Sequence, residues 1–372
     1  MAPLEAILHI LFRNVIDKLS LELYSISKLS LVISKLSLEL YSISKLSLFV
    51  ILLLWMKIFI IPYTITTTNT KRLKNYLDDV GSQVIHIFNS LDFENLTNIA
   101  SGGFSLVHIV YWKNTIKKFA IKNFNENSKE DDIINEIKIM RVVASHPSII
   151  QFYGITKFKD KPHYSLVLEY ADGGTLKNHL RNNAKIKWES QLKFAKEIAA
   201  AILWLHGNAI IHGDLHPNNI LILIHQNTIK LADFGCSRLR GNEYYTKPRP
   251  RGIIPYMDPK ILGNPESYDL TEKSDIYSLG VILWELTSCS SPFDGLARCL
   301  IKSEILKGTR ENPIPNTNNK FVALYKVCWK QEPDERPEIR QVISELNSIE
   351  PNNFNSQETG DEDLCLSSCE VI

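Results

Sequence analysis

The most constraining feature of the sequence is a short polar loop enclosed by two apolar runs, between residues 210 and 224. The first run is Ile210-Ile211, and the second extends from Ile220 to Ile224. Short apolar runs bounded by turn-forming residues indicate buried elements, so the loop between them is expected to be rigid. The polar side chains of the loop are His212, Asp214, His216, Asn218 and Asn219. The loop is therefore the first candidate for a functional site.

A second acidic motif follows the loop, as Asp233-Phe234-Gly235. Phosphoryl transfer needs one oxygen that accepts the proton of the attacking hydroxyl and further oxygens that hold metal ions at the phosphates. The ordered set His-x-Asp-Leu-x-x-x-Asn, followed by Asp-Phe-Gly, resembles the catalytic loop and metal-binding segment of the eukaryotic protein kinases. The resemblance implies that Asp214 is the catalytic base and that Asn219 and Asp233 bind Mg²⁺.

Composition is consistent with an ordinary globular protein. The chain has 372 residues, of which 44% are hydrophobic and 22% charged. A net charge of +1 favours neither a nucleic-acid partner nor an acidic substrate. The six cysteines form no Cys-x-x-Cys pair and are too few for a disulfide scaffold, so a reducing, cytoplasmic location is predicted.

The first 45 residues differ from the rest of the chain. Residues 18–34 and 35–51 are near-identical copies of one segment, rich in alternating leucine and serine. Two copies with so short a period do not match the known stacked repeat architectures. We predict that residues 1–45 are a low-complexity extension with no packed core of their own.

A hydrophobic segment follows at residues 46–66, and its apolar part is residues 46–61 with Lys57 near one end. This part is somewhat shorter than the about 20 residues that span a bilayer as a helix. Trp55 and Tyr63 are suited to an interface, but basic residues on both sides set no orientation. Two interpretations stay open: a membrane helix that anchors the chain with its folded part on the cytosolic side, or a hydrophobic arm outside a membrane.

The resemblance to the kinases covers residues 93–349, with a linker at 67–92 and an acidic, disordered tail at 350–372. It implies an α+β fold with two lobes. One lobe is a small antiparallel β-sheet with one helix, and the other is larger and mainly α-helical. ATP and Mg²⁺ are expected between the lobes.

Residues 99–107 resemble the glycine-rich loop that covers the nucleotide phosphates. Of the three glycines of the family only Gly102 is kept, because Ala100 and Ser105 occupy the other two places. A side chain restricts the backbone more than glycine does. The resemblance implies that the residues of this part that contact the nucleotide are Ile99, Gly102, Val107 and Ala120.

Lys122 ends an apolar strand and resembles the lysine that pairs with the α- and β-phosphates and with a glutamate on a helix. Apolar residues at 133, 137, 140 and 144 predict that helix, with a capping box at residues 128–131. Glu136 lies beside this apolar stripe. A glutamate on a helix is ordinarily solvated, but here the resemblance implies an ion pair with Lys122.

Residues 164–174 read as a strand that enters a glycine turn, and they resemble the hinge between the lobes. The resemblance implies that Leu168 guards the pocket behind the adenine. It also implies that the backbone from Glu169 to Ala171 offers hydrogen bonds to the adenine. Buried helices are predicted at residues 188–205 and 271–286, and Asp275 resembles the aspartate that holds the catalytic loop backbone.

Three departures from the family pattern stand near the site. Gly213 replaces an arginine, which suggests activity that does not depend on phosphorylation of Tyr244, Tyr245 or Thr246. His216 replaces the lysine that serine/threonine kinases place near the γ-phosphate. Lys260 replaces a glutamate that pairs with an arginine matched by Arg336, so we expect Glu266 or another carboxylate to form that pair.

The resemblance implies an ATP-dependent protein kinase that phosphorylates serine or threonine, or else tyrosine, on a protein substrate. Cys328-Trp329, Pro333 and Arg336-Pro337 resemble the ending shared by tyrosine kinases and tyrosine-kinase-like serine/threonine kinases. The lack of the loop arrangements typical of true tyrosine kinases, together with the Pro-Tyr-Met-Asp-Pro segment at 255–259, favours the second group. The alternative is a pseudokinase that serves as a nucleotide-binding scaffold, which the departures favour. The residues on which the chemistry depends are all present, and they favour an enzyme.

Overall fold

The computed structural model describes residues 85–103, 105–182, 186–240, 252–266 and 268–351. The predictions for residues 1–45 and for the hydrophobic segment 46–66 lie outside these ranges, as do those for most of the tail 350–372. Among the residues that the structure describes, no helix is both long enough and apolar enough to cross a bilayer.

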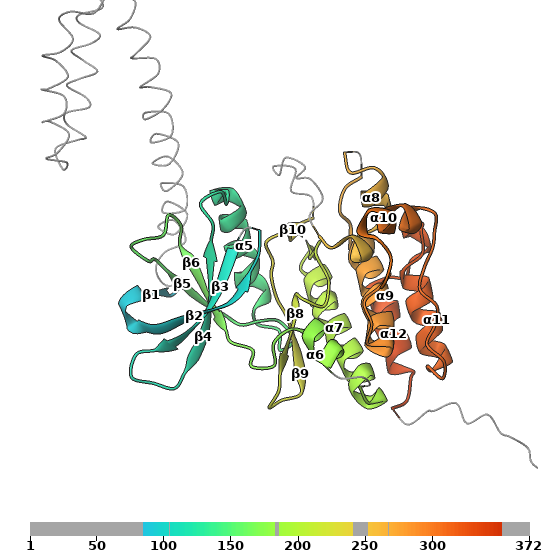
Figure 1. Ribbon diagram of the computed structural model, residues 1–372, viewed down its shortest axis with the longest axis horizontal. Coiled ribbons are helices and arrows are strands. Elements are labelled where there is room, and N and C mark those ends of the chain that lie inside the picture. The colour runs from blue at the N-terminus through green and yellow to red at the C-terminus, as the bar shows by residue number, and fades with distance from the viewer. Residues whose placement is uncertain (1–84, 104, 183–185, 241–251, 267, 352–372) are drawn as a thin grey trace, which may run out of the picture. The chain divides into compact units, whose positions relative to one another are not determined.

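Six strands form one sheet, in the order β1-β5-β6-β4-β3-β2 (Figure 1). Their bounds are Ile87–Phe88 (β1), Phe93–Ser101 (β2), Ser105–Trp112 (β3), Lys118–Phe124 (β4), Phe152–Thr156 (β5) and Ser165–Glu169 (β6). All neighbours are antiparallel except β1 and β5, which run parallel. Strand β1 and the 3-10 turn Ser90–Asp92 lie within the range predicted to be a linker. A two-residue strand is too short to produce an alternating pattern in the sequence.

Helix α5 (Glu130–Val143) covers the sheet with an apolar face (Figure 1). Residues at all four predicted positions of the stripe (133, 137, 140 and 144) are buried, which confirms the helical spacing. The predicted capping box is wrong, because the helix begins at Glu130 and its N-cap, Lys129, makes no side-chain capping bond. Instead, three acidic residues in the first turn, Glu130, Asp131 and Asp132, complement the helix dipole.

The second half of the chain is mainly helical. Its helices are α6 (Leu176–Asn182), α7 (Trp188–Gly207), α8 (Pro259–Gly263), α9 (Glu272–Ser288), α10 (Arg298–Leu306), α11 (Asn319–Cys328) and α12 (Ile339–Asn347). Its short strands are β7 (Ile210–Ile211), β8 (Ile220–Leu223), β9 (Thr228–Leu231) and β10 (Arg238–Leu239). The helices predicted at 188–205 and 271–286 are α7 and α9, and α9 begins with a capping box between Thr271 and Ser274.

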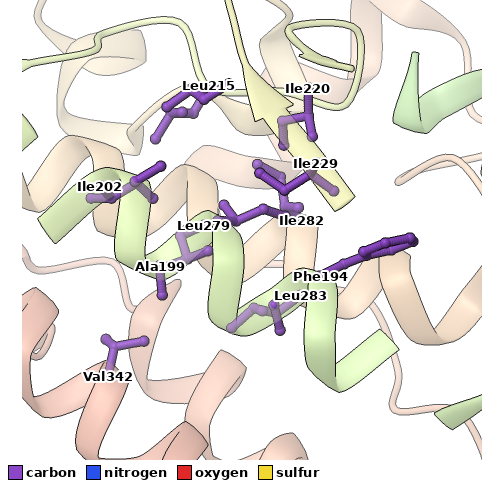
Figure 2. Packing of buried hydrophobic residues seen from close by; sticks show 14 of the residues in the cluster. Phe194, Ala199, Ile202, Leu215, Ile220, Ile229, Leu279, Ile282, Leu283 and Val342 are labelled. Atoms are coloured by element: carbon purple, nitrogen blue, oxygen red, sulfur yellow. The ribbon is translucent and has the colours of Figure 1, made fainter. Parts of the chain in front are cut away.

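The polar loop identified from the sequence joins β7 to β8 and is fixed to the core of the helical part. Leu215 within the loop and Ile220 at its end are 2% and 0% exposed. Figure 2 shows both in one cluster with Ile202 of α7 and Ile282 of α9. Burial of such a side chain stabilises the fold by about 1.5–3 kcal/mol. The fold is α+β, with an antiparallel-rich sheet and one helix followed by a larger helical part, as predicted.

Candidate active site

The sheet presents four of the predicted nucleotide-binding residues on one face. Val107 of β3 is paired with Lys122 of β4, and Ala120 of β4 is paired with Leu168 of β6. Directly paired residues project from the same face, and so do residues two apart on one strand. These four side chains therefore share a face of the sheet.

The turn between β2 and β3 is closed by a hydrogen bond from the Gly102 N–H to the Ser105 carbonyl, at 2.8 Å. A Cβ at Gly102 would meet Ser105 O at 3.6 Å, which is an ordinary contact, so the turn itself does not require glycine there. Ala100 is paired with Val107, whereas Ile99 lies in an irregular part of β2 and is half exposed. The register thus aligns Ala100, and not Ile99, with the shared face.

Lys122 bridges two carboxylates that come from distant parts of the chain. Its Nζ lies 2.6 Å from Glu136 Oε1 on α5 and 2.8 Å from Asp233 Oδ1, which follows β9. The Lys122 and Glu136 side chains are almost fully buried, whereas that of Asp233 is 47% exposed. The pairing of Lys122 with Glu136 that the sequence predicted is therefore present. α5 is fixed near this point by a buried hydrogen bond from Asn135 Nδ2 to the Ser237 carbonyl, at 2.9 Å.

The three charged groups shift one another's pKa. Burial alone would lower the pKa of Lys122, but the Asp233 and Glu136 carboxylates outweigh it and the pKa is raised. Burial raises the pKa of Glu136, and Lys122 offsets this only in part. For Asp233 the attraction of Lys122 prevails over burial and holds the pKa at about 2. At neutral pH the lysine is thus a fixed cation and Asp233 a fixed anion.

Asp233 adopts a left-handed backbone conformation with φ of 63°. For a residue other than glycine such a conformation costs of order 1–3 kcal/mol and persists only where the surroundings impose it. Here the Gly235 N–H donates to Asp233 Oδ1 at 3.2 Å, and Phe234 is fully buried against the His212 ring. His212 Nε2 lies 3.2 Å from the Ala232 carbonyl, and burial lowers the pKa of His212, so a neutral imidazole donates this bond.

Asp275 of α9 holds the backbone of the polar loop. Its carboxylate accepts hydrogen bonds from the N–H groups of His212 and Gly213, both at 2.9 Å, as the sequence predicted. Gly213 has φ of +77°, which favours glycine. A Cβ there would lie 3.1 Å from both Cys236 O and Leu270 Cδ1. The glycine found where the family has arginine therefore suits the local backbone.

Asp214 and Asn219 lie together at the centre of the loop. Asn219 Nδ2 donates to the Asp214 carbonyl at 2.9 Å and lies 3.4 Å from Asp214 Oδ2. Both partners are acceptors only, so the amide nitrogen must face them and the amide oxygen of Asn219 faces away. On the other side, His216 Nε2 is 3.4 Å from Asp214 Oδ1.

The donor set fits Mg²⁺. Asn219 offers an amide oxygen and Asp233 a carboxylate with one oxygen, Oδ2, that takes no part in the contacts given above. Mg²⁺ is ordinarily bound by one or two carboxylates together with substrate phosphates, and not by a complete protein cage. The described part of the chain contains no cluster of three or more His, Cys, Asp or Glu residues suited to a metal ion.

The predicted hinge is the end of β6 and the residues that follow. The Glu169 N–H donates to the Gln151 carbonyl at 2.9 Å, so this N–H is not available for the predicted contact with adenine. Glu169 Oε2 is also 3.1 Å from Lys230 Nζ, which links the hinge to β9. Leu168 and Ala171 are half-buried.

The carboxylate that pairs with Arg336 is Asp258, two residues before Lys260. The bond is bidentate, at 2.7 and 2.9 Å, and both side chains are 0% exposed. Lys260 instead contacts Glu332 at 2.6 Å. The expectation that another carboxylate replaces the family glutamate is confirmed, but Glu266 is not that carboxylate. A sequence signal was present, because Asp258 precedes Pro259 at a helix start and caps the Lys260 N–H at 2.9 Å.

A profile of the family described as "Protein tyrosine and serine/threonine kinase" matches residues 93–346. Three relatives illustrate the range of that family. Mitogen-activated protein kinase kinase kinase 7 of Drosophila melanogaster is 28% identical over 268 residues, which is 70% of this chain and 38% of the relative. A Dictyostelium discoideum protein whose name assigns it to the LIM domain-containing serine/threonine-protein kinases is 32% identical over 284 residues, 73% of this chain and 42% of the relative. The tyrosine-protein kinase TXK of Homo sapiens is 31% identical over 264 residues, 68% of this chain and 47% of the relative.

The similarity is confined to one part of each relative. The chain spans between 12% and 47% of the length of the curated relatives that it matches. What these relatives do through their other parts therefore does not transfer to this chain.

Proposed function

The chain belongs to the family of protein tyrosine and serine/threonine kinases, and from this premise we propose that it transfers the γ-phosphoryl group of ATP to a hydroxyl of a protein substrate. The observation that carries the proposal is the convergence of charged groups from separate elements. Lys122 of β4 contacts Glu136 of α5 and Asp233 in one cluster, and Asp214 and Asn219 contact each other in the loop between β7 and β8. We assign the catalytic domain to residues 93–349.

In this proposal Asp214 orients the acceptor hydroxyl and takes its proton. Lys122 holds the α- and β-phosphates, and Glu136 keeps the lysine in place. Ile99, Gly102, Val107, Ala120, Leu168, Glu169 and Ala171 line the nucleotide site. Of these, Val107, Ala120 and Leu168 are supported by their common face with Lys122, and Glu169 would contribute its carbonyl and not its N–H.

Asn219 and Asp233 are the proposed ligands of Mg²⁺, which when bound neutralises phosphate charge and positions the γ-phosphoryl group. The protein prepares for it in two ways. Asn219 directs its amide oxygen away from Asp214, and Asp233 stays ionised because its pKa is held at about 2. Both groups can therefore bind a hard cation at any physiological pH.

The preferred acceptor is proposed to be serine or threonine, within the tyrosine-kinase-like group. The name of the Dictyostelium relative supports this preference. The human relative is named a tyrosine-protein kinase, so similar domains in other proteins are also assigned to tyrosine. Phosphoamino-acid analysis of the product separates the two.

The pseudokinase alternative rested on departures from the family pattern, and two of them have local explanations. Gly213 occupies a left-handed position that suits glycine, and Asp258 takes over the pair with Arg336 that Lys260 cannot form. Neither departure alters Asp214, Asn219, Asp233, Lys122 or Glu136. The remaining departures, at Ala100, Ser105 and His216, likewise leave these five residues in place.

We propose a cytoplasmic location for the catalytic domain. The described cysteines are free thiols, which is consistent with a reducing compartment. Contact with a membrane through residues 46–61 is a separate proposal, tested by fractionating cells that express the chain with and without residues 1–66. Loss of membrane association on that deletion supports an anchor, and an unchanged distribution contradicts it.

The direct test is ATP-dependent phosphorylation of a generic protein substrate by the full chain and by Asp214→Asn. General-base removal lowers rates by about 10²–10⁴-fold, so we expect activity in the parent and a loss of that order in the variant. Asp214→Asn keeps the size of the side chain and is expected to fold. If neither protein phosphorylates the substrate although both bind Mg-ATP, the enzyme proposal is wrong and the scaffold alternative is supported.

A further inference from the structure

His216 is a buried imidazole beside the proposed catalytic base, and the assignments above give it no role. It lies two residues after Asp214 and is only 6% exposed. Its Nε2 is 3.4 Å from Asp214 Oδ1. Its Nδ1 is buried and has no hydrogen-bonding partner among the described residues. A buried polar atom without a partner requires an explanation, because leaving one unmatched costs stability.

The contact of Nε2 and the lack of a partner at Nδ1 together indicate which ring nitrogen carries the proton. An ionised carboxylate only accepts hydrogen bonds, so the nitrogen that faces Asp214 must be the donor. The opposite tautomer would direct a lone pair at the carboxylate and bury an N–H at Nδ1 with no acceptor. Orphaned buried N–H groups are rarer than under-satisfied acceptors. The geometry therefore favours the ring orientation in which Nε2, and not Nδ1 alone, carries a proton.

The ring is held rigidly. The Asn219 N–H donates to the His216 carbonyl at 2.9 Å, which fixes the backbone. The imidazole lies against the ring of Tyr256, with centroids 6.1 Å apart. Tyr256 is itself buried and donates to Glu285 Oε2 at 2.5 Å. A lysine at this place would be a mobile cation on a flexible stem, whereas His216 is a fixed donor.

The Asp214 carboxylate lies between two nitrogen atoms, His216 Nε2 and Asn219 Nδ2. Oδ1 faces His216, and Oδ2 faces Asn219 Nδ2 at 3.4 Å. Gly252 borders Oδ1 on a further side, since a Cβ there would lie 3.1 Å from that oxygen. The Asn219 contact is a hydrogen bond longer than the usual 2.7–3.2 Å, whereas the His216 contact lies within ion-pair distance without the geometry of a hydrogen bond. Hydrogen bonds around a catalytic group are often long without substrate and shorten in the reacting complex.

We propose that His216 is a positioning residue for Asp214: its Nε2–H holds Oδ1 and fixes the plane of the carboxylate that receives the acceptor proton. The proposal rests on the proposed kinase function. It assigns to His216 a contact with the base and no contact with the phosphates. Loss of the donor should thus affect the chemical step and leave nucleotide binding unaltered.

The kinetic test compares two variants of the full chain that differ in the donor. His216→Phe fills the same space without an N–H, and His216→Gln retains one. We expect kcat to fall about 10–100-fold in His216→Phe, the size of effect that a misplaced catalytic group produces. His216→Gln should recover most of that loss, and KM for ATP and the melting temperature should stay near the parent values in both. Equal losses in the two variants would overturn the proposal.

A double-mutant cycle separates positioning from general structural support. A residue that acts only through Asp214 has nothing left to position in Asp214→Asn. His216→Phe should therefore cause no further loss of the residual activity in that background. An undiminished 10–100-fold loss there would show that His216 acts independently of the base.

A second measurement does not depend on activity. Nitrogen-15 NMR of histidine-labelled full chain reports which ring nitrogen carries the proton, and His216→Gln identifies the signal among the ten histidines. We expect a proton on Nε2 in the parent and a changed distribution of the proton between the two ring nitrogens in Asp214→Ala. A ring protonated at Nδ1 alone would overturn the proposal. If the parent transfers no phosphate, the kinase function fails, while this experiment still decides whether His216 and Asp214 form the pair.

Discussion

Two ionic clusters of the molecule have nearly the same geometry and opposite surroundings. In the first, Lys122 contacts Glu136 and Asp233 at 2.6 and 2.8 Å. In the second, Arg336 contacts the two oxygens of Asp258 at 2.7 and 2.9 Å. The Asp233 side chain is 47% exposed, whereas Asp258 and Arg336 are both 0% exposed.

The difference lies in what each cluster can do when it is disturbed. The first has one cation for two carboxylates, and burial raises the pKa of Glu136, so this cluster can take up a proton. In the second, the cation is a guanidinium, a group that keeps its proton in proteins. Arg336 also donates to the carbonyls of Lys330, Lys273 and Gln331. The Lys122 cluster, whose charge can change, suits a site that exchanges ligands. The Arg336 cluster, whose donors are all paired, suits a purely structural contact.

The largest effect on stability is expected from Asp258→Asn. Asparagine retains the size and the capping ability of aspartate, so the variant isolates the charge opposite Arg336. A buried guanidinium left without its partner cannot neutralise itself, and breaking such a pair costs about 3–5 kcal/mol. Urea unfolding of parent and variant measures the difference. A loss below about 1 kcal/mol would contradict the contrast between the clusters.

A smaller loss of stability, but a large loss of activity, is expected from Lys122→Met. Without the lysine, Glu136 can be protonated and the half-exposed Asp233 can be hydrated, so we expect destabilisation of only about 1 kcal/mol. Removal of a preorganised charge that stabilises a reacting group lowers rates by about 10²–10³-fold. Urea unfolding and the rate of substrate phosphorylation give the two values. Destabilisation as large as that of Asp258→Asn would remove the distinction between the clusters.

A change in pH sharpens the comparison through Glu136→Gln. The pKa of Glu136 in the folded state is raised above its usual 4.5, so its contribution to stability is complete below about pH 4.5 and is lost as the pH rises. Glutamine does not titrate. The unfolding free energy of Glu136→Gln relative to the parent should therefore increase from pH 4.5 towards pH 7. We expect this increase to be smaller than the loss of unfolding free energy in Lys122→Met. A constant difference across this range would contradict the raised pKa.

Asp233 acts in the opposite direction and in a separate pH window. Its pKa is lowered from 3.8 to about 2, so its contribution is present above pH 3.8 and is lost as the pH falls towards 2. The window used for Glu136→Gln therefore excludes the titration of Asp233. The same series measured on Asp258→Asn shows how a variant outside the Lys122 cluster responds to pH.

Local patterns in the sequence predicted the elements of the site well, because the chemistry depends on short motifs. The loop from His212 to Asn219 lies between β7 and β8 as predicted, and α7 and α9 have the expected apolar spacing. Lys122 and Glu136 were predicted as a pair only through the resemblance. No local signal indicates that residues fourteen apart on a strand and a helix meet.

Long-range compensation was harder to predict. Lys260 indicated a lost ion pair, yet the required carboxylate stands two residues earlier, at Asp258. The start of a helix permits this shift, because the aspartate that caps α8 can also direct its oxygens at Arg336. Likewise, the engaged N–H of Glu169 and the bracketing of Asp214 by His216 depend on contacts across loops. Such contacts leave no periodic pattern in the sequence.

The smallest effect is expected from Lys260→Ala, which removes the charge that looked most disruptive in the sequence. Lys260 contacts Glu332 at 2.6 Å, but the two side chains are 34% and 56% exposed. Exposed pairs of this kind contribute about 0–1 kcal/mol, since water and salt screen the charges. Urea unfolding at low and at high salt should show a small loss that decreases with salt, whereas the loss in Asp258→Asn should persist. A large loss of unfolding free energy in Lys260→Ala that does not change with salt would mean that the exposed pair with Glu332 stabilises this region, and not the pair of Asp258 with Arg336.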